Sequence, residues 1–225
     1  MVAENIKNIR QRVVSACCRV HRNPEEITII AVTKTLSVDK IKEVIQAGIY
    51  DIGENYVQEI RQKFVEVPDI KVKWHFIGHL QSNKIKYIGN RIHMIHTVDS
   101  LSLGEQLSKW SEKNNRTLNV LVEVNTTGEE NKFGVTPDET AILVKELFKI
   151  SNLNVKGLMT MGPFLPDPES SRPMFRTLYN LRKSLEADGF KLPVLSMGMT
   201  NDFEVAIEEG ATMVRLGTAI FGSRI

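Results

Sequence analysis

Short apolar runs alternate with helix-like segments along almost the whole chain. Eight of these runs have the length and the β-branched or aromatic content of strands, and most are continuously apolar, as is typical of strands buried on both faces. They lie at residues 28–33, 49–53, 73–78, 93–98, 119–125, 154–160, 193–198 and 212–217. Strands that alternate with helices favour a parallel α/β sheet, and eight such units predict a (β/α)8 TIM barrel.

The segments between these runs carry the apolar spacing and the caps of helices. The sequence predicts helices at residues 3–21, 37–48, 79–89, 136–149, 170–189 and 200–210. The first of them precedes every strand, so it is an extra N-terminal helix outside the barrel repeat. The strongest start signal is the run Thr136, Pro137 and Glu139, which combines a capping threonine, a proline at the first helical position and the glutamate of a capping box.

An open, doubly wound sheet is the alternative to the barrel. Such sheets commonly carry a G-x-G-x-x-G turn after the first strand, and the sequence has none there. No low-complexity linker divides the chain, so we expect a single domain over residues 1–225. The proline-rich segment 161–171 is expected to form a loop after the sixth strand.

The charge balance argues against a nucleic-acid or membrane partner. The formal net charge is +2, and the basic residues are scattered among acidic ones. No run approaches the roughly 18 apolar residues of a membrane span, and the N-terminus lacks the apolar core of a signal peptide. The two adjacent cysteines, Cys17 and Cys18, suit reduced thiols and a cytoplasmic location. A barrel with its own leading helix suits a monomer.

A lysine follows the first predicted strand directly, at the end where barrels carry their active sites. The side chain of Lys34 has two interpretations. Its ammonium group reaches solvent at the rim of the barrel, or its partial burial disfavours the ammonium form and leaves a nucleophilic amine that forms a Schiff base.

Small and hydroxyl-bearing residues follow the last two strands. Thr200 stands at a predicted helix start, and Gly217 and Thr218 follow the eighth strand. Each alone suits a cap or a turn, but together with Lys34 they favour a phosphate site, since barrels bind phosphate after strands seven and eight. Arg215 lies within the eighth strand, where it forms an internal salt bridge or a hydrogen bond to a ligand.

No metal site is expected. His75 and His79 are four residues apart but lie on a strand and a turn rather than on one helix, and His93 and His96 are expected on opposite faces of a strand. The sequence also lacks a G-x-x-x-x-G-K-[ST] phosphate loop and a G-x-S-x-G nucleophile motif.

Six blocks of the sequence closely resemble the pyridoxal phosphate homeostasis proteins, the YggS/PROSC family. The blocks cover nearly the whole chain in order and read AVTKT, IGENYVQE, WHFIGHLQSNK, VNTTGEENKFG, GLMTMGP and LSMGMTNDFEVAIEEGATMVRLGTAIFG. This family is similar in its barrel to the N-terminal domain of alanine racemase, the fold type III of pyridoxal phosphate (PLP) proteins. The resemblance implies a protein of cellular PLP and vitamin B6 homeostasis that hands PLP to PLP-dependent apoenzymes.

The resemblance also implies roles for individual residues. Lys34 would form the internal aldimine with PLP, and Arg215 would face the pyridine nitrogen. The phosphate would be held by Thr200, Gly217 and Thr218, helped by Ser196 at the rim, while Asn55 and His79 would lie beside the ring. The family usually has serine at position 200, so the hydroxyl is kept here and a methyl group is added. The segment GAT at 210–212 commonly reads GST.

These roles predict a site that binds PLP with little or no catalytic turnover. Arginine stays cationic and accepts no proton, so it leaves the pyridine nitrogen unprotonated and the electron sink weak. Racemisation also needs an acid on the second face of the substrate, which alanine racemase takes from a tyrosine of a separate domain; we expect no such domain after Ile225. The alternatives are a single-domain racemase, a Schiff-base aldolase without cofactor and a purely structural barrel.

Overall fold

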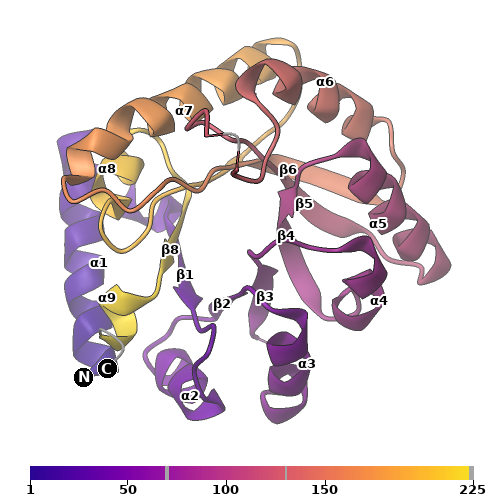
Figure 1. Ribbon diagram of the computed structural model, residues 1–225. Helices are drawn as coiled ribbons and strands as arrows, with labels where there is room; N and C mark the ends of the chain where they lie inside the picture. Colours follow the sequence, from indigo (N-terminus) through magenta and orange to yellow (C-terminus); the bar gives the residue numbers. More distant parts are fainter. Residues whose placement is uncertain (69–70, 130, 223–225) are drawn as a thin grey trace.

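Eight parallel strands pair in chain order, and the first also pairs with the last (Figure 1). The computed structural model describes residues 1–68, 71–129 and 131–222. Its strands are β1 (Thr28–Val32), β2 (Asp51–Glu54), β3 (Lys73–Phe76), β4 (Ile92–Val98), β5 (Leu118–Glu123), β6 (Leu153–Met159), β7 (Val194–Ser196) and β8 (Met213–Leu216). The closed barrel confirms the predicted (β/α)8 architecture and excludes the open sheet.

Helices surround the strands on the outside of the barrel (Figure 1). They are α1 (Val2–Arg19), α2 (Val38–Gln46), α3 (Val57–Glu66), α4 (Ile85–Ile88), α5 (Leu101–Lys113), α6 (Pro137–Phe148), α7 (Arg172–Ala187), α8 (Phe203–Glu208) and α9 (Thr218–Phe221). Short 3-10 helices lie at Pro24–Glu26, Ser82–Lys84 and Pro168–Ser171. Of the helices in the described part of the chain, none has both the length and the apolar character that a membrane span requires.

The extra N-terminal helix α1 packs over the last helices of the chain. Its buried side chains, among them Ile6, Ile9 and Val13, recur at helical spacing. It packs against α8 and α9, and the Asn5 side-chain amide donates to the Ile220 carbonyl oxygen at 2.9 Å. The helix therefore supports α9, which begins at the cavity described below.

Three helices were not predicted from the sequence: α3, α5 and α9. The buried face of α3 includes Lys63, and that of α5 includes Gly104 and Ser111. These residues interrupt the apolar periodicity on which the prediction depends. An added Cβ at Gly104 would lie 2.2 Å from a Leu147 methyl carbon, so the glycine is what lets α5 approach α6.

The predicted helix starts at Thr136 and Ser37 are confirmed, and the one at Thr200 is wrong. Thr136 and Glu139 form the predicted capping box at α6. Ser37 occupies the cap position of α2, but its side chain makes no capping bond. The helix expected from Thr200 begins instead at Phe203.

The inside of the barrel is mixed apolar and polar. Met94, Leu121 and Met159 form a small inner cluster, separate from the large apolar core between strands and helices. Inward-pointing His96 and Arg215 are also buried. Because a charged group in this interior needs hydrogen-bond partners, the polar side chains near the carboxyl ends of the strands define where chemistry is possible.

Candidate functional site

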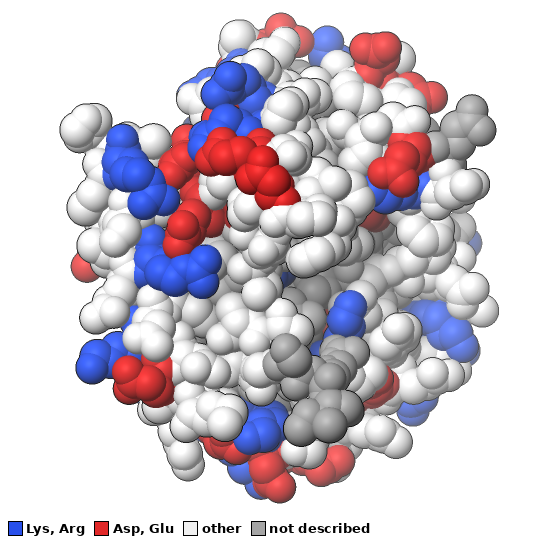
Figure 2. Space-filling model, turned by 60° about the vertical axis from the view of Figure 1, so that its left-hand side comes forward, with Lys and Arg blue, Asp and Glu red and all other residues white. Residues whose placement is uncertain are grey.

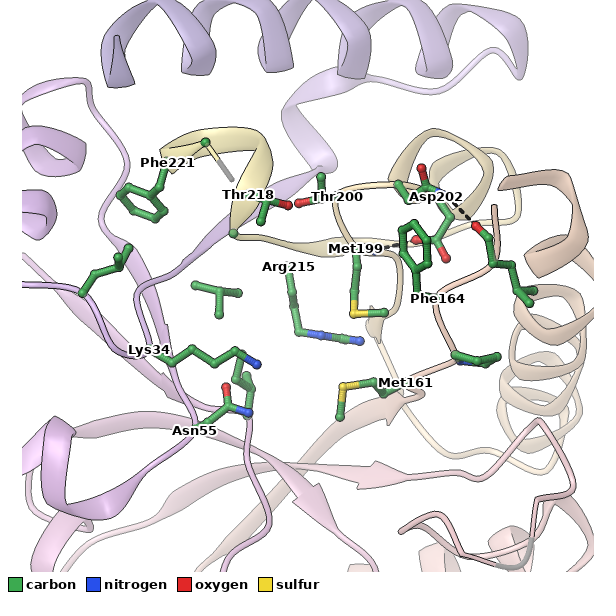
Figure 3. Close-up of a pocket in the computed structure, with 18 residues that line it drawn as sticks. Lys34, Asn55, Met161, Phe164, Met199, Thr200, Asp202, Arg215, Thr218 and Phe221 are labelled. Carbon is green, nitrogen blue, oxygen red and sulfur yellow. Dashed lines mark hydrogen bonds between the residues drawn. The ribbon is translucent and has the colours of Figure 1, made fainter. Parts of the chain in front are cut away.

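A cavity of about 450 Å³ opens at the carboxyl ends of the strands (Figure 3). This volume falls within the ~300–1,000 Å³ typical of small-molecule sites. Six of the eight residues predicted for the site line it: Lys34, Asn55, Thr200, Arg215, Gly217 and Thr218. Large apolar side chains that were not predicted as site residues also line it, among them Met161, Phe164, Met199 and Phe221.

Lys34 lies in the turn that follows β1. The side chain is partly buried, and its amine points toward the middle of the cavity (Figure 3). The next residue, Thr35, has φ of 63°, a left-handed conformation that is unusual for a β-branched residue. The turn therefore fixes the direction of the lysine side chain through a demanding backbone geometry.

Asn55 lies beside Lys34 on the same side of the cavity (Figure 3). Its backbone can come this close to the end of β3 because residue 78 is glycine: an added Cβ there would lie 2.2 Å from the Asn55 carbonyl oxygen. The side-chain oxygen of Asn55 is buried and has no hydrogen-bond partner. A buried acceptor without a partner at a cavity wall is suited to a ligand that donates a hydrogen bond.

Arg215 is 4% exposed, and its guanidinium group crosses the cavity floor (Figure 3). It donates to Ser196 Oγ at 2.6 Å and to the Thr160 carbonyl oxygen at 2.8 Å. Burial lowers the pKa of Arg215 to about 10, against the opposing influence of Glu123 and Asp202, so the group remains cationic at neutral pH. Hydrogen bonds to neutral oxygens, rather than an internal salt bridge, hold it in the described part of the chain.

A chain of hydrogen bonds runs from Arg215 through the barrel interior. Ser196 Oγ lies 3.0 Å from His96 Nδ1, His96 Nε2 lies 2.9 Å from His75 Nδ1, and His75 Nε2 lies 2.9 Å from Asp51 Oδ1. Arginine only donates, and an ionised aspartate only accepts.

Arg215 and Asp51, at the two ends of this chain of hydrogen bonds, fix the position of each proton between them. With neutral imidazoles, His75 Nε2–H donates to Asp51, His96 Nε2–H donates to His75, and the Ser196 hydroxyl donates to His96. Burial, and then electrostatic interactions that include the charge of Arg215, hold the pKa of His96 well below its usual range, in agreement with the neutral form. None of these contacts was predicted from the sequence.

The corner of the cavity at the end of β8 is polar. The hydroxyl groups of Thr200 and Thr218 point toward one another (Figure 3), and Thr200 Oγ1 accepts the backbone N–H of Ala219 at 3.2 Å. Gly217 caps α9, whose first backbone N–H groups start at this corner. Hydroxyl groups and helix N–H donors favour an anion.

The proline-rich loop between β6 and α7 forms one wall of the cavity. The Asn201 side-chain amide donates to the Leu165 carbonyl oxygen at 2.7 Å, and Ser171 Oγ donates to Asp202 Oδ2 at 3.0 Å. Asp202 Oδ1 accepts the Met199 N–H at 2.7 Å. These bonds join the loop after β6 to the loop after β7, so both walls hold one shape.

Two predicted site residues lie outside the cavity lining. Ser196 is fully buried beneath Arg215, so its expected position at the rim is wrong: the last residue of β7 points into the barrel. His79 stacks on Phe133 with ring centroids 4.1 Å apart, and its Nδ1 lies 3.9 Å from Asp99. Both residues were predicted because they lie at the carboxyl ends of strands, where barrels carry their active sites. This strand-end rule does not give the direction of a side chain.

Glu123 is a buried acid close to the cavity that the sequence did not indicate. It ends β5, is 4% exposed, and its Oε2 atom has no hydrogen-bond partner. Burial and the charge of Asp99 raise its pKa to about 7, against the opposing effect of Arg215.

No group of three or more histidine, cysteine, aspartate or glutamate side chains within residues 1–68, 71–129 and 131–222 could hold a metal ion. The prediction that His93 and His96 point to opposite faces is wrong, since both rings pack against His75 at centroid distances of 5.3 and 5.1 Å. The register of β4 against β3 shifts at His75, which removes the strict alternation on which the prediction relied.

Positive and negative side chains lie side by side on the face shown in Figure 2, without a broad field of one sign. Many form pairs, such as Arg172 with Glu208 at 2.5 Å and with Glu209 at 2.9 Å. The face shown in Figure 2 has no basic stripe that would suit a nucleic-acid backbone.

Comparisons with known proteins agree with this geometry. The family model for the alanine racemase N-terminal domain matches residues 2–225. The chain is 42% identical to the pyridoxal phosphate homeostasis protein of Aquifex aeolicus, over 98% of this chain and 97% of that protein. It is 40% identical to the protein of the same name from Vibrio alginolyticus, over 99% and 97%.

A solved structure extends the likeness to three dimensions. PipY of Synechococcus elongatus PCC7942, solved with PLP bound, is similar to this chain with a TM-score of 0.86 and 29% identity, over 99% of this chain and all of that one. With the barrel, the cavity and the sequence in agreement, the chain belongs to the pyridoxal phosphate homeostasis proteins, within the alanine racemase N-terminal domain family.

Proposed function

We propose that this protein binds PLP covalently through Lys34 and takes part in the supply of PLP, with little or no catalytic turnover of its own. The observation that carries the proposal is that the Lys34 amine and the Arg215 guanidinium share one cavity of about 450 Å³ with an anion-favouring corner. PLP presents an aldehyde, a pyridine nitrogen and a phosphate, and each has a chemical counterpart here.

The residues of the cavity fit this cofactor group by group. The Lys34 amine is a nucleophile for the aldehyde. The hydroxyls of Thr200 and Thr218, with the first N–H groups of α9, suit the phosphate. Arg215 suits a ring nitrogen that accepts a hydrogen bond. The unpartnered Asn55 oxygen offers an acceptor for a hydroxyl group of the ligand.

Low turnover follows from what Arg215 and the opposite wall can do. PLP enzymes use the protonated pyridine ring as an electron sink. Arg215 supplies a donor that stays charged, and Ser196 and the Thr160 carbonyl hold it in place. A bound ring nitrogen facing this donor would stay unprotonated.

The wall facing Lys34 is apolar where a racemase needs a second proton donor. Met161 and Met199 occupy it (Figure 3). Asp202 is the carboxylate among the described lining residues, and both of its oxygens already accept hydrogen bonds. This carboxylate is therefore committed to joining the loops rather than to moving a proton.

The family relatives support the physiological part of the proposal. Proteins 42% and 40% identical are named pyridoxal phosphate homeostasis proteins, and PipY was solved with PLP bound. We infer a single PLP-binding barrel unit over residues 1–225 that acts as a monomer in the cytoplasm and passes PLP to PLP-dependent apoenzymes. The free thiols of Cys17 and Cys18 suit a reducing compartment.

Absorption spectroscopy tests the proposal directly. Purified protein mixed with PLP should gain a visible band that survives gel filtration, and borohydride reduction should fix the cofactor on the Lys34 peptide. Lys34→Ala should abolish the band, whereas Lys145→Ala should keep it, since Lys145 is an exposed residue of α6 paired with Asp188. A wild-type protein that stays colourless with PLP contradicts the binding proposal, and steady racemisation of amino acids contradicts the low turnover.

A further inference from the structure

A second lysine lies on the outer side of β1 and β2, beneath the turn that carries Lys34. Lys63 of α3 is 6% exposed. Its Nζ donates to the Thr33 carbonyl oxygen at 2.8 Å, to Glu54 Oε1 at 2.7 Å and to Glu59 Oε2 at 3.3 Å. An ammonium group has three N–H donors, so these acceptors use all of them.

The residue before Lys34 is held at two atoms. The Thr33 carbonyl accepts from Lys63, and Thr33 Oγ1 donates to Glu54 Oε1 at 2.5 Å. Glu54 is fully buried, and burial raises its pKa while hydrogen bonds from Lys63 and Thr33 oppose that rise. Lys63 therefore opposes the rise in the pKa of Glu54 and holds its carboxyl group in place for Thr33.

The residue after Lys34 is held by the same cluster. The Thr35 backbone N–H donates to Glu59 Oε2 at 2.7 Å, and this oxygen also accepts from Lys63. Thr35 is the residue with φ of 63°. A left-handed threonine is strained and persists only where its surroundings fix it. The bond to Glu59 is one such fixing contact.

We propose that Lys63 is a positioning residue for Lys34: its ammonium holds Thr33 and, through Glu59, Thr35, and so aims the lysine between them into the cavity. This inference rests on the proposed function, because it concerns the amine that binds the aldehyde. Lys63 itself does not react, since two carboxylates and a carbonyl hold all of its protons. The cluster thus also decides which of the two neighbouring lysines is the nucleophile.

The variants must separate positioning from the stability of a buried ion pair. Lys63→Met keeps most of the side-chain volume but leaves Glu54 as a buried charge without its partner, which is strongly destabilising. The double variant Lys63→Met/Glu54→Gln removes both charges, and neutral replacements of buried pairs are often tolerated. The amide introduced by Glu54→Gln keeps an oxygen that accepts from the Thr33 hydroxyl. The contacts that Lys63 makes to Thr33 and Glu59 in the wild type are lost.

Two measurements on the folded double variant test the proposal. Hydrogen exchange of the Thr35 amide in PLP-free protein should be about tenfold faster or more than in the wild type, because Glu59 is no longer held. The apparent dissociation constant for PLP should rise by about tenfold or more, because small misplacements of a reacting group are costly. Thermal unfolding should stay close to wild type, and Lys145→Met, which removes an exposed charge on α6, should change none of the three quantities.

The outcomes are distinct. A folded double variant with wild-type Thr35 exchange and wild-type PLP affinity overturns the positioning role and leaves charge balance as the whole function of Lys63. Borohydride trapping of PLP on Lys63 in the wild type also overturns it. Failure of the wild type to form any adduct is instead a failure of the proposed function, and the Lys34→Ala control identifies that case.

Discussion

Arg215 Nη1 lies 2.6 Å from Ser196 Oγ, and this hydrogen bond joins the cavity floor to the interior of the barrel. The same hydroxyl lies 3.0 Å from His96 Nδ1. Because the arginine only donates, Ser196 can accept from it and pass its own hydrogen to the histidine. One serine thereby satisfies a buried cation and a buried neutral imidazole at once.

Ser196→Ala should therefore destabilise the protein strongly for so small a change. The alanine leaves a guanidinium N–H and His96 Nδ1 without a partner, and a hydrogen bond to a charged group contributes about 1.5–3 kcal/mol. We expect the free energy of unfolding, measured in urea, to fall by about 2–3 kcal/mol. Ser108→Ala is the matched control, since its hydroxyl donates to a carbonyl outside the barrel interior. Equal losses for the two variants would contradict the role given to Ser196.

The buried acid Glu123 predicts a pH dependence of stability. Burial raises its pKa to about 7, above the unfolded value of 4.5. A carboxyl group whose folded pKa is raised binds its proton more tightly in the folded state, so stability is lost as pH rises from 4.5 through about 7 and the loss is constant above that.

Glu123→Gln removes this dependence. The free energy of unfolding of the variant minus that of the wild type should increase by up to roughly 3 kcal/mol between about pH 5 and pH 8. Each pKa unit corresponds to about 1.36 kcal/mol. Urea unfolding of both proteins across this range measures the difference. Parallel pH profiles of the two proteins would show that Glu123 is not the titrating group.

Two glycines near the cavity should respond differently to alanine. A Cβ at Gly78 would lie 2.2 Å from the Asn55 carbonyl oxygen, which is backbone and cannot turn away. A Cβ at Gly217 would meet Val32 at 3.8 Å, an ordinary contact. Gly78→Ala should lower the free energy of unfolding by about 1–3 kcal/mol and displace Asn55. Gly217→Ala should lower the free energy of unfolding by less than about 1 kcal/mol. Thermal unfolding and PLP titration check both; a neutral Gly78→Ala would contradict the close approach.

The sequence predicted the barrel because its signals are local. Eight apolar strands and the Thr136 capping box depend on neighbours in the chain, and the strand-end rule then identified Lys34 and Arg215. The direction of a strand-end side chain depends on which face of the strand it occupies. Ser196 was expected at the rim, but it points into the barrel.

Contacts between distant segments carried no local signal. The pair of His75 and His96 spans 21 residues, and Lys63 lies 30 residues from the Thr33 carbonyl that it holds. Phe164 lines the cavity because Asn201 ties its loop to the next one. Such positions follow only from the closed barrel, where loops from different strands meet at one end.

The hydroxyl of Thr200, which lines the cavity, should carry the interaction with phosphate. Thr200 Oγ1 accepts the Ala219 N–H at 3.2 Å, so it fixes the start of α9 at the corner proposed for the phosphate. Thr200→Ser keeps this oxygen and should bind PLP within about twofold of the wild type, whereas Thr200→Val keeps the shape, loses the hydroxyl and should weaken PLP binding by about tenfold. Pyridoxal, which has the aldehyde but no phosphate, provides the internal comparison. Its affinity should be the same in all three proteins, measured by the visible band; an equal loss for pyridoxal and PLP in Thr200→Val would place the defect at Lys34 or in the fold rather than at the phosphate.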